Sequence, residues 1–329
     1  MSCQSEGEFK KIKHNYTFNK KDGDGLTNIL LLVATMIIGI MVPSYMYMGW
    51  VLLTILVIRI YMEPIQLLYM VSCVITLITR TPEFLDKDTY FPMNHVFERP
   101  ENLRLLKKEL QDVLNMTNNG DGLVMTNKTY GGENKYIGSD IRLVNGITKA
   151  WRLINIKAGK QYSDVAHTHF PTLVQILHDI PQIVSCAISV LQDGVHIPIH
   201  VGYYKGIMRY MIPIMVPKDR ENVYLCVNEK KYRWTEGVGV LWDDTYPHKV
   251  YNNTNEIRVV IYMDVVRPLP CFLQWLNLFV LWLACNSKVV KDEIKKTEIQ
   301  IKNQPVKRKE EDAMRKMFQE GRHNVMTFY

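Results

Sequence analysis

The 329-residue sequence lacks the motifs that mark several large enzyme classes. It contains no glycine-rich phosphate loop, no Gly-x-Ser-x-Gly nucleophile elbow and no internal repeat, which argues against P-loop nucleotide chemistry, α/β-hydrolase chemistry and solenoid folds. Its six cysteines include no Cys-x-x-Cys pair and no spacing typical of a metal site. We therefore expect buried or free thiols, as in a reducing compartment, in place of a disulfide framework.

Charge is absent from one long stretch, residues 26–58. A secretory signal peptide has a much shorter apolar core. One helix of this length would reach about 50 Å, against a bilayer core of about 30 Å. Residues 26–62 are therefore predicted to be a transmembrane region, either a helical hairpin folded near Pro43 or one tilted helix with an interfacial extension. Residues 1–25 form a polar, basic segment, which favours a cytosolic N-terminus and, with a hairpin, a catalytic domain on the cytosolic side of the membrane.

Two shorter apolar stretches follow. Residues 63–80 are expected to form a helix that is either membrane-associated or packed in the core. Residues 271–285 are rich in Trp and Leu but carry Gln274 and Asn277, and we expect a helix lying at the membrane interface. Residues 286–329 form a charged tail of mixed sign, which reads as solvated, so no nucleic-acid partner is expected.

The remaining chain predicts a mainly β domain with helical support. Residues 81–150 read as a mixed helical support region, with helical periodicity over residues 102–114. From residue 151 to residue 270 the pattern changes to short strands separated by turns, which is typical of a sandwich or barrel. The expected strands are "VSCAISVL", "HIPIHVG", "IMRYMIPIMV", "VYLCV", "KYRWTEG", "GVLWDD", "HKVYNN" and "IRVVIYMDVV".

Two histidines and an arginine on separate expected strands carry the candidate chemistry. His200 lies in "HIPIHVG", His248 follows an acidic turn, and Arg258 begins an apolar strand. Burying an arginine is costly unless it holds an anion. Imidazoles can bind Fe(II), and an arginine deeper in a barrel can bind the carboxylate of an organic acid cosubstrate. On spacing alone, packed histidines remain an alternative.

Residues 151–270 resemble the aspartyl/asparaginyl β-hydroxylase family of Fe(II)/2-oxoglutarate dioxygenases. The resemblance runs in order through "ISVLQDGVHIPIHVG", "MRYMIPIMVP" and "YRWTEGVGVLWDDTYPHKVYNNTNEIRVVIYMDVVRPLP". It implies a double-stranded β-helix (jelly-roll) domain and an enzyme that uses Fe(II), 2-oxoglutarate and O2. By position, His200 and His248 resemble the iron ligands, Ser189 and Arg258 the pair that binds the distal carboxylate of 2-oxoglutarate, and Arg209 the arginine beside the iron and its cosubstrate or substrate.

Gly202 stands where many such enzymes have a carboxylate ligand, and the resemblance implies that the protein hydroxylases of this family share this glycine. Asp243 and Asp244 are then candidates to compensate by orienting His248, and either one is an alternative ion-pair partner for Arg209. The membrane-anchored layout is similar to that of bacterial lipid A acyl hydroxylases. We therefore expect a membrane-integral hydroxylase acting on protein Asp or Asn side chains, with a lipid acyl-chain hydroxylase and an inactive membrane-tethered binding module as the alternatives.

Overall fold

The computed structural model describes residues 30, 33–34, 65–120, 123, 142–144, 147–295 and 297. The expected transmembrane region over residues 26–62 lies outside this part of the chain, except for Leu30, Val33 and Ala34. Among the helices that are described, none combines the length and the apolar character that a membrane span requires.

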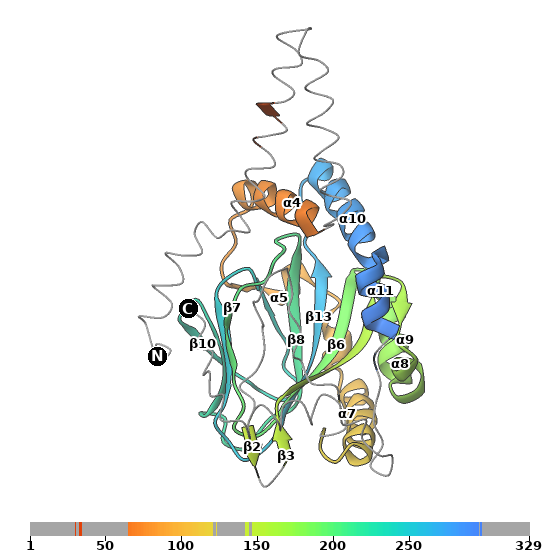
Figure 1. Ribbon diagram of the computed structural model, residues 1–329, viewed down its shortest axis with the longest axis vertical. Helices are drawn as coiled ribbons and strands as arrows, with labels where there is room; N and C mark the ends of the chain where they lie inside the picture. The colour runs from red at the N-terminus through yellow and green to blue at the C-terminus, as the bar shows by residue number, and fades with distance from the viewer. Residues whose placement is uncertain are drawn as a thin grey trace, which may run out of the picture.

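Two antiparallel sheets form the centre of the molecule (Figure 1). The larger has the order β1-β11-β8-β13-β6-β4-β5 and the smaller the order β10-β9-β12-β7. The strands of the larger sheet are β1 (Phe84–Leu85), β4 (Trp151–Ala158), β5 (Gln161–Tyr162), β6 (Ile183–Leu191), β8 (Ile207–Met215), β11 (Val240–Trp242) and β13 (Arg258–Val266). Those of the smaller sheet are β7 (Ile197–His200), β9 (Val223–Val227), β10 (Lys230–Arg233) and β12 (His248–Asn252). A separate ribbon pairs β2 (Arg142–Val144) with β3 (Ile147–Lys149).

The connectivity of β6 to β13 is that of a double-stranded β-helix. The larger sheet contains the run β11-β8-β13-β6 and the smaller sheet is β10-β9-β12-β7, so the chain crosses between the sheets at every step except β9 to β10. This eight-stranded arrangement is the jelly roll. Each of the eight predicted strand segments overlaps one of these strands, and the largest difference at the start of a strand is one residue. The expectation of a mainly β fold is confirmed.

Alternation along the strands separates two cores. On β13, Val259, Ile261 and Met263 pack against the outer helices, whereas Val260 packs between the two sheets. The outer core is covered by α7 (Pro100–Met116), α8 (Asp164–His169) and α9 (Pro171–Asp179), with the short helices α5 (Lys87–Tyr90) and α6 (Asn94–Glu98) before them. Arg258 lies on the same face of β13 as Val260, between the two sheets.

Helices α4 (Ile65–Ile78) and α10 (Cys271–Asn286) pack together at one end of the sheets (Figure 1). Val71 and Ile75 of α4 share a buried cluster with Val280 of α10. Residues 63–80 therefore contain a packing helix, although its last turn exposes Leu77 and Ile78. The outer side of α10 exposes large apolar side chains, namely Phe272, Trp275, Leu276, Leu278, Phe279 and Trp282. The next helix, α11 (Lys288–Lys295), packs on β4 and β5.

The polar residues inside the apolar sequence of α10 have structural partners. Asn277 is fully buried; it accepts a hydrogen bond from the Tyr204 hydroxyl at 2.6 Å and donates one to the Gly206 carbonyl at 2.8 Å. Gln274 accepts from the Leu269 amide at 2.9 Å. The amide side chains of Asn277 and Gln274 are therefore both engaged in hydrogen bonds within the protein.

One expectation about the cysteines needs correction. Cys73, Cys186, Cys271 and Cys285 are free thiols, as expected. Cys226, however, takes part in a disulfide bond. Sequence spacing could not show this pairing, because a disulfide depends on proximity in the fold.

Candidate active site

The two histidines lie side by side across a pair of antiparallel strands. His200 ends β7 and His248 begins β12, and the two residues are direct partners in the β7–β12 pairing. Their ring centroids are 4.0 Å apart. His248 is 2% exposed and also contacts the edge of the Trp242 ring, at a centroid distance of 4.6 Å. The fold thus brings together two residues that are 48 positions apart in the sequence.

Backbone carbonyls fix the orientation of both imidazoles. Nδ1 of His200 lies 2.9 Å from the Pro198 carbonyl oxygen, and Nδ1 of His248 lies 2.8 Å from the Tyr246 carbonyl oxygen. A carbonyl can only accept, so Nδ1 carries the proton and the lone pair is on Nε2, which is how a metal-binding histidine is usually held. Burial, followed by the neighbouring His200, lowers the pKa of His248 well below its ordinary value. Both features suit neutral metal ligands.

The carboxylate of Asp244 occupies the space beside Gly202. A Cβ on Gly202 would lie 2.4 Å from Cγ and 2.5 Å from each carboxylate oxygen of Asp244, so the glycine is required by packing. The Gly202 amide also donates to the Asp244 carbonyl at 2.7 Å. Within the described residues, Oδ1 of Asp244 is buried without a hydrogen-bond partner. Burial raises the pKa of this carboxyl to about 6, although Arg209 opposes the shift.

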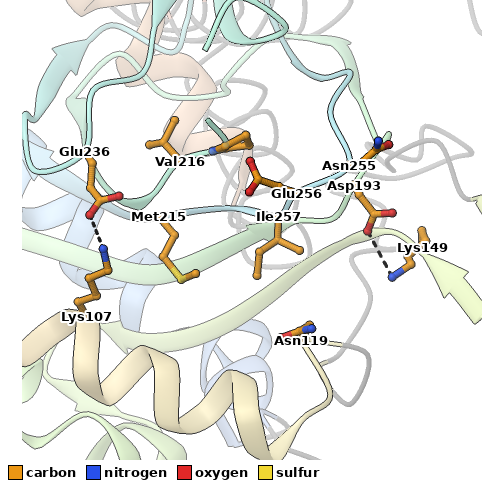
Figure 2. A pocket seen from close by; sticks show the side chains of 11 residues that line it. Lys107, Asn119, Lys149, Asp193, Met215, Val216, Glu236, Asn255, Glu256 and Ile257 are labelled. Atoms are coloured by element: carbon orange, nitrogen blue, oxygen red, sulfur yellow. Dashed lines mark hydrogen bonds and ion pairs between the residues drawn. The ribbon is translucent and has the colours of Figure 1, made fainter. Parts of the chain in front are cut away.

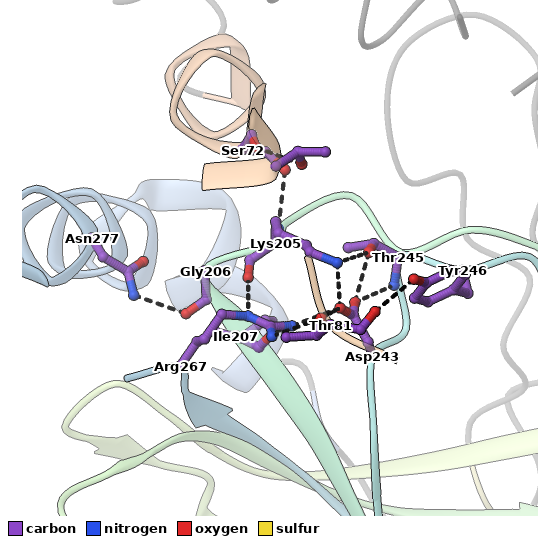
Figure 3. A network of polar contacts seen from close by, with 11 residues as sticks. Ser72, Thr81, Lys205, Gly206, Ile207, Asp243, Thr245, Tyr246, Arg267 and Asn277 are labelled. Atoms are coloured by element: carbon purple, nitrogen blue, oxygen red, sulfur yellow. Dashed lines mark hydrogen bonds and ion pairs between the residues drawn. The ribbon is translucent and has the colours of Figure 1, made fainter. Parts of the chain in front are cut away.

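The expectation that Asp243 or Asp244 orients His248 through its second ring nitrogen is wrong, because the Tyr246 carbonyl takes that position. The carboxylate of Asp243 is instead buried in a network with Lys205 at 2.5 Å and Arg267 at 2.8 Å (Figure 3). Burial alone would raise the pKa of Asp243, but the two cations outweigh it and lower the pKa.

This network fixes the loop between the first histidine and β8. The Lys205 amide donates to Ser72 of α4 at 3.0 Å, and its carbonyl accepts from Arg267 at 2.6 Å (Figure 3). The next carbonyl, that of Gly206, is held by Asn277 of α10. Helices α4 and α10 are therefore tied directly to the loop that carries Gly202.

Arg209 is held between two carboxylates. Its Nη1 lies 3.0 Å from Asp244, and its Nε and Nη2 donate to Asp264 at 3.0 and 2.9 Å. The guanidinium also lies 5.0 Å from the centre of the Tyr262 ring. Burial would lower the pKa of Arg209, but the two carboxylates outweigh it and raise the pKa. Of the two ion-pair partners considered from the sequence, Asp244 is found and Asp243 is not.

Arg258 lies on the same face of β13 as Asp264, deeper between the sheets, and it is fully buried. Its Nη1 is 3.5 Å from Ser189 Oγ, which also accepts from Trp151 at 2.8 Å, and the guanidinium lies over Trp234. Nε and Nη2 have no hydrogen-bond partner in the described part of the chain. Burial lowers the pKa of Arg258 to about 9. A buried cation with unused donors fits an anionic ligand, as the sequence predicts for a cosubstrate carboxylate.

A cavity of about 230 Å³ reaches several of these groups. His200, Gly202, Arg209, Asp244 and Asp264 lie at its polar end. Trp151 lines the cavity and donates to Ser189, so the cavity adjoins the Arg258 site. The other lining residues are Leu153, Asn155, Lys157, Ala158, Ser185, Cys186, Ala187, Val201, Tyr203, Tyr262, Val290 and Ile294.

A larger hollow, of about 500 Å³, lies where β6 and β8 end and β13 begins (Figure 2). Its lysines are paired with carboxylates, Lys107 with Glu236 at 2.5 Å and Lys149 with Asp193 at 3.3 Å. Neither histidine of the pair lines it, and neither do Arg209 and Arg258. The candidate chemistry therefore lies in the smaller cavity.

Several residues of the site did not stand out in the sequence. Asp264 completes the pairing of Arg209, and Val290 and Ile294 of α11 reach the cavity from outside the β domain. Asp264 could have been found, because residues 258, 260, 262 and 264 share one face of a strand. The α11 residues carry no local signal of this kind. No group of three or more His, Cys, Asp or Glu residues suited to a metal is found within the described residues.

A family model described as aspartyl/asparaginyl β-hydroxylase matches residues 100–268, just over half of the chain. The chain belongs to the aspartyl/asparaginyl β-hydroxylase family. The matched segment contains both histidines, Ser189, Arg209 and Arg258. Membership in this family agrees with a hydroxylase.

Two curated relatives have different substrates. An ornithine lipid ester-linked acyl 2-hydroxylase from Rhizobium tropici is 26% identical over 156 residues, which is 47% of this chain and 55% of the relative. The human aspartyl/asparaginyl β-hydroxylase is 26% identical over 103 residues, 30% of this chain and 13% of the relative. The chain thus spans about half of the first relative and a small part of the second.

Similar solved structures include a prolyl-4-hydroxylase from Pseudomonas putida, with 10% identity and a TM-score of 0.34, covering 52% of this chain and 90% of that chain. A 2OG-Fe(II) oxygenase family protein from Burkholderia pseudomallei has 12% identity and a TM-score of 0.29, covering 40% and 73% of the two chains. Similarity at this level says nothing about the reaction.

Within the described residues the guanidinium of Arg258 has no carboxylate partner, which predicts an unusual stability profile. Because an unpaired buried charge costs free energy, we expect Arg258→Met to leave the ligand-free protein as stable as the wild type or more stable. Addition of 2-oxoglutarate at one hundred times Kd should stabilise the wild type by about 2.7 kcal/mol and so raise its melting temperature. The melting temperature of the variant should not change. Thermal unfolding with and without 2-oxoglutarate measures both effects.

Arg152 provides the matched control, because it is also buried but donates to Gln192 and to the Leu123 carbonyl. Arg152→Met should lower the melting temperature and keep the response to 2-oxoglutarate. A destabilised Arg258→Met protein that still responds to 2-oxoglutarate would show that Arg258 is a structural residue.

Proposed function

We propose that this protein is a membrane-held hydroxylase that uses Fe(II), 2-oxoglutarate and O2 to hydroxylate an unactivated C–H bond. One observation carries the proposal: two imidazoles, each held through Nδ1 by a backbone carbonyl, lie side by side at a cavity that adjoins the site of a buried guanidinium, and within the described residues this guanidinium has no carboxylate partner. Such a pair suits a metal, and such a guanidinium suits an organic acid. Family membership and the polar end of the cavity support the same reading.

His200 and His248 would hold the iron through Nε2, with the carbonyls of Pro198 and Tyr246 fixing the rings. Arg258, with Ser189, would bind the distal carboxylate of 2-oxoglutarate. Together, iron and 2-oxoglutarate supply the oxidation: O2 delivers one oxygen atom to the C–H bond and one to 2-oxoglutarate, which leaves as succinate and CO2. The apolar walls of the cavity would keep bulk water away from the reacting carbon.

Asp244 would compensate for the carboxylate ligand that Gly202 cannot supply. Its Oδ1 lacks a hydrogen-bond partner within the described residues, and the carboxylate fills the space beside the glycine. We propose that this oxygen accepts a hydrogen bond from water at the third ligand position. Arg209 holds the other oxygen of Asp244 and so sets the angle of the carboxylate.

The outer faces of α10 and α4 support a location at the membrane. Trp275 is 73% exposed and Trp282 is 59% exposed, and the neighbouring Leu77 of α4 is 79% exposed. No charged residue occurs within α10. Indole side chains favour the interface between bilayer and water, and residues 26–58 are uncharged. We propose that α10 lies on the bilayer, with the catalytic domain on the cytosolic side, as the basic N-terminal segment indicates.

Turnover by the full-length protein in detergent tests the enzymatic proposal. With Fe(II), ascorbate and 2-oxoglutarate, we expect the wild type to form succinate, and His200→Ala and His248→Ala to reduce succinate formation to background because each removes an iron ligand. His178→Ala is the control, because the side chain of His178 is 79% exposed on α9, in the outer helical layer. Succinate formation that survives both site substitutions would contradict the assignment. A folded wild type without Fe(II) affinity or turnover would indicate the inactive binding module.

Tryptophan quenching in reconstituted vesicles tests the membrane contact. Lipids brominated in the upper part of their acyl chains should quench Trp275 and Trp282, because these indoles are exposed on α10. The variant Trp275→Phe with Trp282→Phe should lose this part of the quenching, and vesicles without bromine provide the baseline. Quenching of both residues by aqueous iodide, with none by brominated lipid, would place α10 in water.

A further inference from the structure

Helix α11 closes one side of the candidate active-site cavity. Val290 and Ile294 line the same cavity as His200 and Arg209. The helix packs on β4 and β5, at one edge of the larger sheet (Figure 1). It begins at Lys288, after the end of the family match at residue 268. This aliphatic wall is therefore contributed by a segment outside the part of the chain that matches the family.

The charges at the polar end of the cavity already have partners. All three nitrogens of Arg209 contact a carboxylate, of either Asp244 or Asp264. The second oxygen of Asp264 accepts from Ser185 at 2.5 Å. A substrate carboxylate would have to displace a buried carboxylate of the protein to reach Arg209, which opposes binding of a charged aspartate side chain.

Lys157 does not supply an alternative cation. Its ammonium group donates to the Leu177 carbonyl of α9 at 3.2 Å and lies 5.7 Å from the centre of the Tyr162 ring. Leu177 belongs to the core between the larger sheet and the outer helices. The charge of Lys157 is therefore directed to the helical side of the sheet, although the residue contributes to the cavity lining.

Beyond Arg209, the cavity offers mainly apolar surface. Leu153 and Tyr262 from the larger sheet and Val290 and Ile294 from α11 surround it, and Tyr203 of the β7–β8 loop is 38% exposed. Transfer of a hydrocarbon chain from water to such a lining is favourable. The helix that supplies Val290 and Ile294 follows α10 directly, because only Ser287 separates the two helices, and the two helices contact each other.

We propose that the cavity binds a neutral aliphatic chain of a membrane lipid, and that Val290 and Ile294 are the residues that select it. The choice of substrate rests on the proposed hydroxylase function, whereas binding of the chain does not. The lipid approaches from the α10 face, its hydrocarbon packs against α11, and the carbon to be modified lies near His200 and His248.

Photocrosslinking tests chain binding without any need for turnover. The full-length protein is reconstituted in phosphatidylcholine vesicles that carry a diazirine near the middle of the acyl chain, and the labelled peptides are mapped by mass spectrometry. We expect labelling of two regions, the outer face of α10 and the cavity residues of α11 and β4. Labelling of α10 alone, with an unlabelled cavity, would overturn the proposal.

Filling the cavity provides the decisive variant. Val290→Trp should reduce cavity labelling by about tenfold or more, because steric exclusion of a chain from an apolar pocket has effects of this size. Labelling of α10 and the thermal stabilisation by 2-oxoglutarate should not change. Lys288→Trp is the matched control, because it adds the same side chain at an exposed position on the same helix. Ile294→Ala, which enlarges the cavity, gives a second test if Val290→Trp fails to fold, and should shift labelling toward longer chains.

Failure of this proposal can be separated from failure of the proposed function. Succinate formation that is stimulated by an Asp- or Asn-containing peptide, with a mass gain of about 16 on the peptide, and is insensitive to Val290→Trp, would keep the hydroxylase and overturn the lipid substrate. Cavity labelling that depends on Val290, in a protein without turnover, would keep the lipid site and overturn the hydroxylase. A mass gain on the lipid that Val290→Trp abolishes supports both.

Discussion

The pairing of His200 with His248 across β7 and β12 is the constraint on which the rest of the site depends. It sets the centres of two imidazole rings 4.0 Å apart, and a backbone carbonyl lies at the Nδ1 atom of each ring. A third ligand on the same strand would follow at residue 202, but the Asp244 carboxylate already fills that space. Glycine at this position leaves room for the Asp244 carboxylate, which comes from the turn between β11 and β12.

The second constraint is the balance of buried charge. Arg209 is neutralised by two carboxylates of the protein, while two nitrogens of Arg258 have no hydrogen-bond partner in the part of the chain that the structure describes. The site therefore has a place for one anion, at Arg258, and apolar walls elsewhere. The network around Asp243 ties the histidine-bearing loops to α4 and α10, whose outer faces are apolar. The same helices that would contact a bilayer are thus tied to the loop after His200.

The sequence allowed the β domain and the two-histidine site to be predicted, because both leave local patterns. Alternation of apolar residues marks the strands of the jelly roll, and ordered blocks around His200, Arg209, His248 and Arg258 carry the family resemblance. The placement of Asp244 could not be predicted, since it depends on the turn geometry between β11 and β12. The disulfide at Cys226 and the cavity wall formed by α11 are also products of tertiary contact, and a helix outside the catalytic domain gives no signal that it returns to the site.

The number of imidazole ligands on bound iron tests the central claim most directly. X-ray absorption spectroscopy of the full-length protein, loaded anaerobically with Fe(II) and 2-oxoglutarate, resolves imidazole from oxygen ligands. The account predicts two imidazoles, with oxygen atoms at all other positions, and the loss of this signal in His200→Ala and His248→Ala. A third imidazole, a sulfur ligand, or an unchanged spectrum in either variant would contradict it.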